Sequence, residues 1–258
     1  MSQEAVRSNY NDIGAFVMER IYAPGFLSLE GPVATQRLID AAQLQANERV
    51  LEVGSGLGGP ALHIAATVPC HVTGVDIVPD NVSHASDAAH AAGLAARSRF
   101  VVGDALSLPF ADQRFDVVVG QDAWCHIPHK DRFVASLPGM LAPGGRVAFS
   151  DWLVADGLPA DLRSEVGEVT ASPGIASQAQ YAQWLANAGL ILEHTQDLTT
   201  VFADEYERVL ARLSELEAEV TARFSAKVAR IVYGKHAFIA ERFQRAQLRG
   251  VLFLARVA

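Results

Sequence analysis

The chain has 258 residues, half of them hydrophobic, and a formal net charge of −8. This length suits one large α/β domain with insertions, and no run approaches the roughly 18 apolar residues that a membrane span requires. The acidic balance, with only three lysines, argues against a surface that follows nucleic-acid phosphates.

The first twelve residues, MSQEAVRSNYND, are polar and do not resemble a signal peptide. Two cysteines, Cys70 and Cys125, cannot form a disulfide framework and lack the spacing of a metal site. We therefore expect a cytoplasmic protein, a monomer or homodimer, with no metal and no nucleic-acid or membrane partner.

Residues 1–48 precede the first strand and are rich in aromatic side chains, which predicts a helical lid over whatever the core binds. The alternative is that these rings only pack a helix onto a sheet. Within this segment, residues 31–44 have apolar side chains at helical intervals and predict a helix that packs on the sheet.

Residues 49–60, RVLEVGSGLGGP, predict a strand, a glycine turn and the start of a helix. Glycines at such a turn leave room for a ligand beside the free N–H groups of the helix start. The spacing of Gly54, Gly56 and Gly59 fits the dinucleotide pattern, so the turn alone leaves open an NAD site, a site for S-adenosylmethionine, or no site.

Four more strands are predicted in the core, at residues 71–77, 100–102, 115–120 and 146–149, with helices between them. Such alternation predicts parallel strands with helices on both faces. Asp76 ends the second strand, where a carboxylate can accept hydrogen bonds from both ribose hydroxyls. A helix cap or a solvated side chain is the alternative.

The remainder, residues 156–258, predicts an irregular polar segment, a helix at 181–188 and a strand at 190–198. Residues 205–224 form an amphipathic helix, either a lid, a packing element or a dimer contact, and helical pattern continues to about Arg245. A terminal strand at 250–257 brings the total to seven. The sequence thus predicts a doubly wound, mostly parallel seven-stranded sheet, with a lid (1–48), a core (49–155) and a remainder carrying a helical insertion (156–258).

In order and spacing, the chain resembles the class I S-adenosylmethionine-dependent methyltransferases, which have a Rossmann-like fold. The resemblance rests on VLEVGSGLGG, GVDI, GDALSLPFADQRFDVVV and LAPGGRVAFSD, a series not expected of an NAD-linked dehydrogenase. Within that class the chain is similar to the phosphoethanolamine and sarcosine/dimethylglycine N-methyltransferases, through YAPGFLSLEGPVATQRLIDAAQL and GQDAWCHIPHKDRF. The similarity runs from Asn9 to Phe149, returns at the FLARV ending, and is loose from Asp156 to Phe202.

The resemblance implies S-adenosylmethionine as cofactor, S-adenosylhomocysteine as product and a small-molecule methyl acceptor. It implies that residues from five segments hold the cofactor: Tyr10, Ser28, Gly54 and Gly56 at its methionine end, Asp76 and Ile77 at the ribose and adenine, Asp104 and Ala105 at the adenine amino group, and Gln121 close by. On the acceptor side it implies Asp122 and His126, with Tyr10 as a lid that latches onto the histidine.

The chain departs from the phosphobase branch in the lobe after the fifth strand. Residues 164–180, SEVGEVTASPGIASQAQ, contain none of the tyrosines and basic residues that bind the substrate phosphate there, unless Arg242 or Arg245 substitutes. Trp124 and Trp152 are expected to offer flat apolar surface to a ring or an ammonium group.

Three functions remain open from the sequence. The first is N-methylation of an unphosphorylated amine or nitrogen heterocycle, as in natural-product biosynthesis. The second is methylation of a hydroxyl or carbon on the same fold, and the third is a non-catalytic cofactor-binding protein. An acceptor that must lose a proton would need a base, for which we expect His126, oriented by Asp122, which would raise the pKa of the imidazole if it is ionised.

Overall fold

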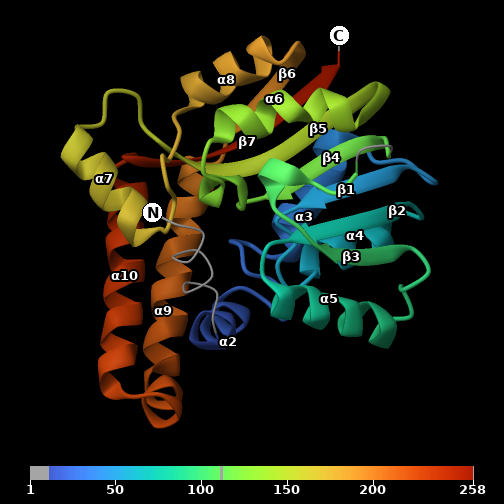
Figure 1. The fold of residues 1–258 in the computed structure, drawn as a ribbon. Helices are drawn as coiled ribbons and strands as arrows, with labels where there is room; N and C mark the ends of the chain where they lie inside the picture. Colours follow the sequence, from blue (N-terminus) through green and yellow to red (C-terminus); the bar gives the residue numbers. More distant parts are fainter. Residues whose placement is uncertain (1–11, 111–112, 258) are drawn as a thin grey trace.

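The computed structural model describes residues 12–110 and 113–257, and Figure 1 shows their arrangement. Its strands are β1 Arg49–Val53, β2 His71–Asp76, β3 Ser98–Val102, β4 Phe115–Gln121, β5 Leu141–Val154, β6 Leu190–Asp197 and β7 Leu248–Val257. Its helices are α2 Asp12–Ile21, α3 Pro32–Ala42, α4 Gly59–Thr67, α5 Pro79–Ala91, α6 Lys130–Met140, α7 Ala160–Val169, α8 Gln178–Asn187, α9 Thr199–Arg223 and α10 Ala226–Gln244, with short 3₁₀ turns η1 Ala105–Ser107 and η2 Trp124–His126.

The strands form one sheet in the order β3-β2-β1-β4-β5-β7-β6. β1 to β5 pair in parallel, and only β7 runs antiparallel, between β5 and β6. The predicted doubly wound, mostly parallel sheet is confirmed. Because the chain order reverses between β1 and β4, a crevice is expected at the carboxyl ends of these two strands.

Alternate side chains of each strand enter separate cores on the two faces of the sheet. Val50 and Val117 face the core shared with α2, α3, α4, α9 and α10, while Leu51 and Val118 face the one shared with α6 and α8. Because successive side chains of a strand point to opposite faces, near-continuous apolar runs are required where both faces are covered.

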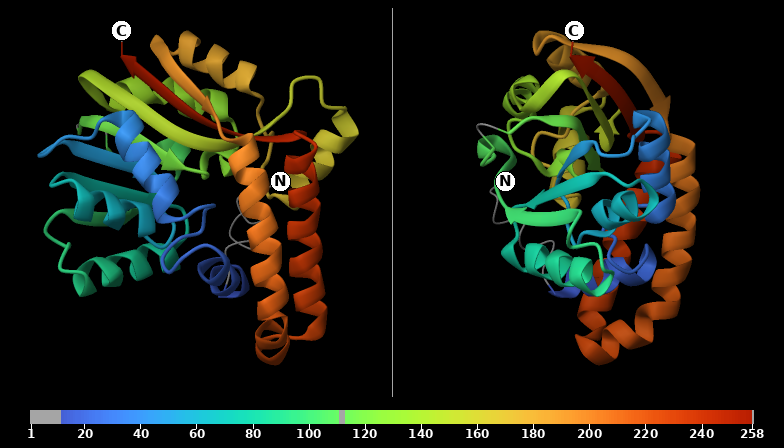
Figure 2. Two further views of the ribbon diagram at one scale, coloured as in Figure 1. Left: turned by 180° about the vertical axis from the view of Figure 1, so that it is seen from behind. Right: turned by 90° about the vertical axis from the view of Figure 1, so that its right-hand side faces the viewer.

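Helices α9 and α10 run side by side as an antiparallel hairpin that extends away from the end of the sheet, with α2 lying against it (Figures 1 and 2). The sequence predicted continuous helical pattern here, but the chain turns at Phe224 and Ser225, where the Ser225 hydroxyl caps α10 by accepting from the N–H of Val228. None of the described helices is long and apolar enough to cross a membrane.

Two further expectations are wrong. Residues 160–169, taken as irregular, form α7. β5 begins at Leu141 and continues to Val154, well beyond the predicted 146–149, because it pairs with β4 on one side and with nine residues of β7 on the other.

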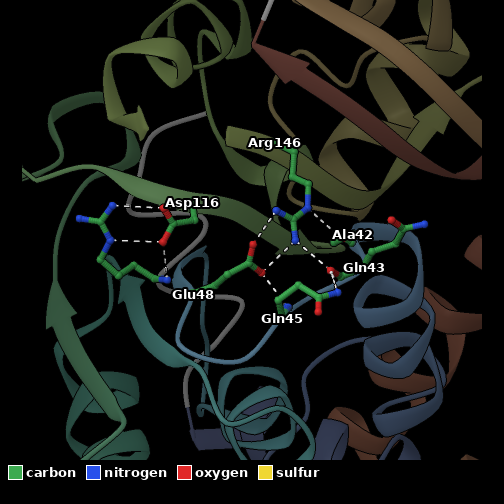
Figure 3. Close-up of polar contacts among 7 residues, drawn as sticks. Ala42, Gln43, Gln45, Glu48, Asp116 and Arg146 are labelled. Atoms are coloured by element: carbon green, nitrogen blue, oxygen red, sulfur yellow. Dashed lines mark hydrogen bonds and ion pairs between the residues drawn. The ribbon is translucent and has the colours of Figure 1, made fainter. Parts of the chain in front are cut away.

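An ionic network holds α3 to the sheet at the edge where the parallel strands begin (Figure 3). Arg146 of β5 donates two hydrogen bonds to the Glu48 carboxylate, at 2.8 and 2.9 Å, and further bonds to the carbonyls of Ala42 and Gln43 at the end of α3. The last carbonyls of a helix have no partner within it, so a guanidinium there satisfies them. This edge lies opposite the carboxyl ends of the strands.

Candidate functional site

The loop after β1 can contain only glycine at its first position. Gly54 has φ +85°, and a Cβ atom there would lie 2.5 Å from the Cβ of Ala123, on the loop after β4. Gly56 also has positive φ, and a Cβ there would meet Leu27 at 3.0 Å. The carboxyl ends of β1 and β4 therefore approach each other closely, with bare backbone facing the crevice.

Asp76, at the end of β2, is bonded to this loop. Its Oδ2 accepts from the N–H of Gly56 at 2.8 Å, and its Oδ1 accepts from the N–H of Val78 at 2.9 Å and from Asn81 at 3.3 Å. Burial raises the pKa of Asp76 although these hydrogen bonds oppose the rise. The carboxylate thus also serves as a turn residue while it lines the pocket, and a carboxylate has capacity for further donors.

One pocket brings together every predicted site residue that the structure describes. It is lined by Ser28, Gly54, Gly56, Asp76, Ile77, Asp104, Ala105, Gln121, Asp122 and His126, along with Gly25, Leu27, Val53, Ser55, Leu57, Pro60, Val75, Val78, Asn81, Gly103, Ala123, Ile127 and Pro128. Tyr10 lies outside the described residues. Among the described residues that line the pocket there is no lysine or arginine.

Asp104 and Ala105 form the wall contributed by the end of β3. The Asp104 side chain accepts from the N–H of Leu106 at 2.9 Å, which caps the short η1 turn. Capping fixes the carboxyl group at the rim of the pocket, next to Asp76 on the neighbouring strand.

Gln121 ties the N-terminal segment to the end of β4. Its amide donates to the Ser28 hydroxyl at 2.7 Å and to the carbonyl of Gly31, and it accepts from the Thr35 hydroxyl at 2.6 Å. A second tie runs from the N–H of Gly59 to the carbonyl of Gly25. Residues 25–28 are thereby held over the glycine loop, where they form part of the pocket wall.

Asp122 follows β4 with φ +51° and is 7% exposed. Its Oδ1 accepts from the Ser150 hydroxyl at 2.6 Å, and its buried Oδ2 makes no hydrogen bond of normal geometry, although the Trp152 side chain is close enough to lower the pKa of Asp122. Burial, with the negative charges of Asp151 and Glu30 adding to it, raises the pKa of Asp122 to about 7, against the effect of the Ser150 bond. A buried carboxyl oxygen that can still accept a hydrogen bond indicates a place where a ligand could bind with a hydrogen-bond donor.

His126 ends η2 and is half-buried. The expectation that Asp122 orients it is wrong, because its Nδ1 lies 3.0 Å from the carbonyl oxygen of Ala171, which only an Nδ1–H can satisfy. The expected rise in pKa is also wrong: burial lowers the pKa of His126 to about 4. The imidazole is therefore neutral near pH 7, with Nε2 as its basic nitrogen.

Of the two tryptophans expected to face the acceptor, Trp124 does not. It is fully buried, stacks on Phe149 with ring centroids 4.1 Å apart, and donates from Nε1 to the carbonyl of Val53. Trp152 is half-buried, and its rings lie edge-on to Tyr206 and Phe243.

Several site residues escaped the sequence analysis. Ser150 is the last residue of β5 that pairs with β4, so its position opposite the end of the neighbouring parallel strand could have found it. Leu27 and Asn81 carry no comparable signal, since an apolar loop residue and a first-turn asparagine are common elsewhere.

The comparisons with known proteins agree with this geometry. A family model described as a methyltransferase domain matches residues 51–149. The phosphoethanolamine N-methyltransferase of Triticum aestivum is 31% identical over 217 residues, which are 83% of this chain and 42% of that protein. The chain thus spans less than half the length of that relative.

Two further proteins extend the comparison. The 27-O-demethylrifamycin SV methyltransferase of Amycolatopsis mediterranei (strain S699) is 30% identical over 212 residues, 80% of this chain and 77% of that one. The phosphoethanolamine N-methyltransferase 2 of Haemonchus contortus, solved with phosphomonomethylethanolamine and S-adenosylhomocysteine, superposes with a TM-score of 0.88 at 23% identity, covering 97% of this chain and 58% of that one. At 23% identity, the structural similarity shows a shared fold and no more.

Proposed function

We propose that this chain, which belongs to the class I S-adenosylmethionine-dependent methyltransferases, methylates a nitrogen of an unphosphorylated small molecule, an amine or a nitrogen heterocycle. The observation that carries the proposal is Oδ2 of Asp122, a buried carboxyl oxygen that makes no hydrogen bond of normal geometry, on the wall of a pocket that no described lysine or arginine lines. An amine N–H is the donor that such an oxygen requires.

The pocket fits the cofactor on its own chemistry. Gly54 and Gly56 leave bare backbone where a side chain would obstruct, and Asp76 and Asp104 end neighbouring strands with carboxylates suited to hydroxyl and amino donors. We propose that Asp76 and Ile77 hold the ribose and adenine, that Asp104 and Ala105 hold the adenine edge, and that Ser28, Gly54, Gly56 and Gln121 surround the methionine end, with Tyr10 closing over it. When bound, S-adenosylmethionine would supply an electrophilic methyl group on its sulfonium.

The protein's main task in such a displacement is alignment, which can be worth roughly 7–11 kcal/mol in well-positioned systems. Asp122 would accept a hydrogen bond from the acceptor nitrogen and so direct its lone pair toward the cofactor. His126, neutral and held by Ala171, would accept a second hydrogen bond at Nε2. Residues 25–28, tied down by Gln121, would exclude water from the reacting groups.

A phosphorylated acceptor is disfavoured. A dianion needs charge-assisted partners, and the described pocket walls hold none. Arg242 bonds Gln247 and Glu241, and Arg245 pairs with Glu241, so both guanidinium groups are engaged elsewhere. The proposed acceptor is accordingly unlike the phosphoethanolamine in the names of several relatives.

Methylation of a hydroxyl is the second candidate. It is favoured by the relative named for 27-O-demethylrifamycin SV, of which the chain covers 77%, and by the neutral His126, whose Nε2 could take a hydroxyl proton. Asp122 distinguishes the two candidate functions. A hydroxyl has one proton and can bond only one of Asp122 and His126, whereas an amine with two N–H groups can bond both. In either case we propose a cytoplasmic enzyme acting as a monomer or homodimer.

The test is turnover of S-adenosylmethionine to S-adenosylhomocysteine with a panel of acceptors: ethanolamines, secondary amines, imidazoles and indoles, phenols, and phosphoethanolamine. Methylated amines or heterocycles, identified by mass, would support the proposal. Methylation of phosphoethanolamine alone, or of phenols alone, would overturn the choice of acceptor. Absence of S-adenosylhomocysteine binding would overturn the cofactor.

A further inference from the structure

Lys130, the first residue of α6, is 3% exposed, which is unusual for a lysine. Its ammonium group donates to the carbonyl of Ile127 at 2.9 Å, to that of Pro173 at 2.8 Å and, more weakly, to that of Gly174 at 3.5 Å. A buried ammonium therefore joins the segment after η2 to the turn that follows α7.

Asp151 of β5 is the charge partner of this ammonium and is fully buried. Its Oδ1 accepts from the N–H of Cys125 in η2 at 2.8 Å, and its Oδ2 accepts from the Tyr181 hydroxyl at 2.7 Å. The carboxylate thus fixes η2 from one side while Lys130 fixes it from the other. Lys130 and Asp151 are thus buried opposite charges that are each hydrogen-bonded to other groups, and such an arrangement is costly to disrupt and holds its surroundings in one conformation.

The turn that Lys130 holds is the one that orients His126. Pro173 and Gly174 lie two and three residues after Ala171, whose carbonyl faces Nδ1 of His126. Ala171 has φ +53°, a conformation unfavourable for alanine, and its carbonyl direction therefore depends on support from neighbouring residues. The Ser172 N–H supplies part of this support through the carbonyl of Gly167.

We propose that Lys130 is a positioning residue, which clamps the 171–174 turn against η2 and thereby keeps His126 in the tautomer protonated at Nδ1, with Nε2 directed to the acceptor. The role given to His126 rests on the proposed function. The tautomer itself does not, because it is a property of the protein without ligands.

The test measures the tautomer directly, by ¹⁵N NMR of the histidine side chains near pH 7, in the wild type and in Lys130→Met. The His126 signals are assigned by their loss in His126→Asn. In the wild type we expect Nδ1 to carry the proton and Nε2 to be unprotonated. In Lys130→Met the turn loses its clamp, and we expect a shift toward the Nε2–H form, together with a loss of about 10²-fold in kcat from misplacement of the imidazole.

The matched control is Lys235→Met. Lys235, like Lys130, lowers the pKa of His126 through its charge, but it is Lys130 that bonds the carbonyls of Pro173 and Gly174 in the turn after Ala171. Lys235→Met should therefore leave the tautomer unchanged. An equal change of tautomer in both variants would show an effect of charge alone and would overturn the proposal.

Lys130→Gln, which keeps two donors, serves if the methionine variant does not fold, and it should give a smaller shift of tautomer. A wild-type His126 protonated at Nε2, or an unchanged tautomer in a folded Lys130 variant, would overturn the inference while leaving methyl transfer untouched. Failure of both variants to fold would also overturn it, because Lys130 would then support the whole core. Conversely, if no acceptor is ever methylated, the proposed function fails and the tautomer result stands.

Discussion

The Ser150 hydroxyl donates a 2.6 Å hydrogen bond to one carboxyl oxygen of Asp122, and the other oxygen of that group is buried and makes no hydrogen bond of normal geometry. Asp122 directly follows β4, Ser150 pairs with Gln121 where β4 and β5 part, and the Asp122 N–H also donates to the Ser150 carbonyl. Asp122 is thereby fixed with its unsatisfied oxygen in place. The protonation state of Asp122 is then expected to control how the site binds its acceptor.

The first prediction concerns the pH dependence of kcat/KM. If ionised Asp122 holds the acceptor nitrogen, kcat/KM should fall as the pH decreases through about 7. Ser150→Ala removes a bond that lowers the pKa of Asp122, so the acid limb should move to higher pH. Asp122→Asn should abolish the limb and cost about 1.5–3 kcal/mol, roughly 10–10²-fold in kcat/KM.

The control for this profile is His126→Asn. Because the pKa of His126 lies near 4, its removal should leave the limb near pH 7 in place. A limb that disappears with His126 and persists in Asp122→Asn would assign the proton to the histidine instead.

The second prediction concerns stability. The pKa of Asp122 is raised from 3.8 to about 7 on folding, so the folded state binds this proton more tightly. The stabilisation is present below pH 3.8 and is lost as the pH rises to about 7. Asp122→Asn should therefore raise the melting temperature more at pH 8 than at pH 5. Equal changes at the two pH values would contradict the buried, unpaired carboxyl group.

The third prediction concerns the close approach at Gly54. Gly54→Ala combines positive φ, worth roughly 1–2 kcal/mol, with a clash against Ala123, and should reduce both stability and cofactor affinity. Gly93→Ala has positive φ but open space, so it should show the backbone cost alone. Adding Ala123→Gly to Gly54→Ala should recover the difference, measured by thermal unfolding and calorimetry. No recovery would mean that the contact with Ala123 does not matter.

The fourth prediction concerns Asp76. Asp76→Ala removes the proposed ribose partner and the bond that holds the Gly56 N–H, and should weaken S-adenosylhomocysteine binding by about 1–3 kcal/mol, roughly 5–150-fold. Asp80→Ala, an exposed change four residues later, should leave the affinity as it is. Calorimetric titration of both variants is the measurement. Equal affinity in the two would reduce Asp76 to a turn residue.

The fifth prediction tests the network of Figure 3. Arg146→Ala removes the guanidinium bonds to the carbonyls of Ala42 and Gln43 and to the Glu48 carboxylate, of which only Gln43 and Glu48 keep a bond from Gln45, and should destabilise the fold by about 1.5–3 kcal/mol in denaturant unfolding. Arg49→Ala breaks a more exposed pair with Asp116 and should cost at most about 1 kcal/mol. Because this edge lies opposite the pocket, cofactor affinity should stay the same in both. A larger loss of stability in Arg49→Ala than in Arg146→Ala would contradict the role given to Arg146 at the end of α3.

The sequence by itself predicted the seven strands in their chain order, most of the helices between them, and the residues at or next to the ends of β1 to β4. Apolar runs, glycines and strand-ending carboxylates are local features, and parallel strands bring their carboxyl ends to one edge whatever the details of packing. Gly54, Asp76 and Asp104 were predictable for this reason, Asp122 was implied by the family resemblance, and the structure lines one pocket with all four. The break between α9 and α10 was not, since a single serine cap within a helical pattern is a weak local signal.

Only the tertiary structure decided which partner each polar side chain meets. His126 and Ala171 are 45 residues apart, and their contact depends on a turn that Lys130 holds from a third segment. Likewise, Trp124 lies next to site residues in sequence but packs into the core, because η2 directs its ring toward Phe149. Hydrogen bonds and burial between distant segments follow from how the faces of the sheet are covered, and that information is spread over the whole chain.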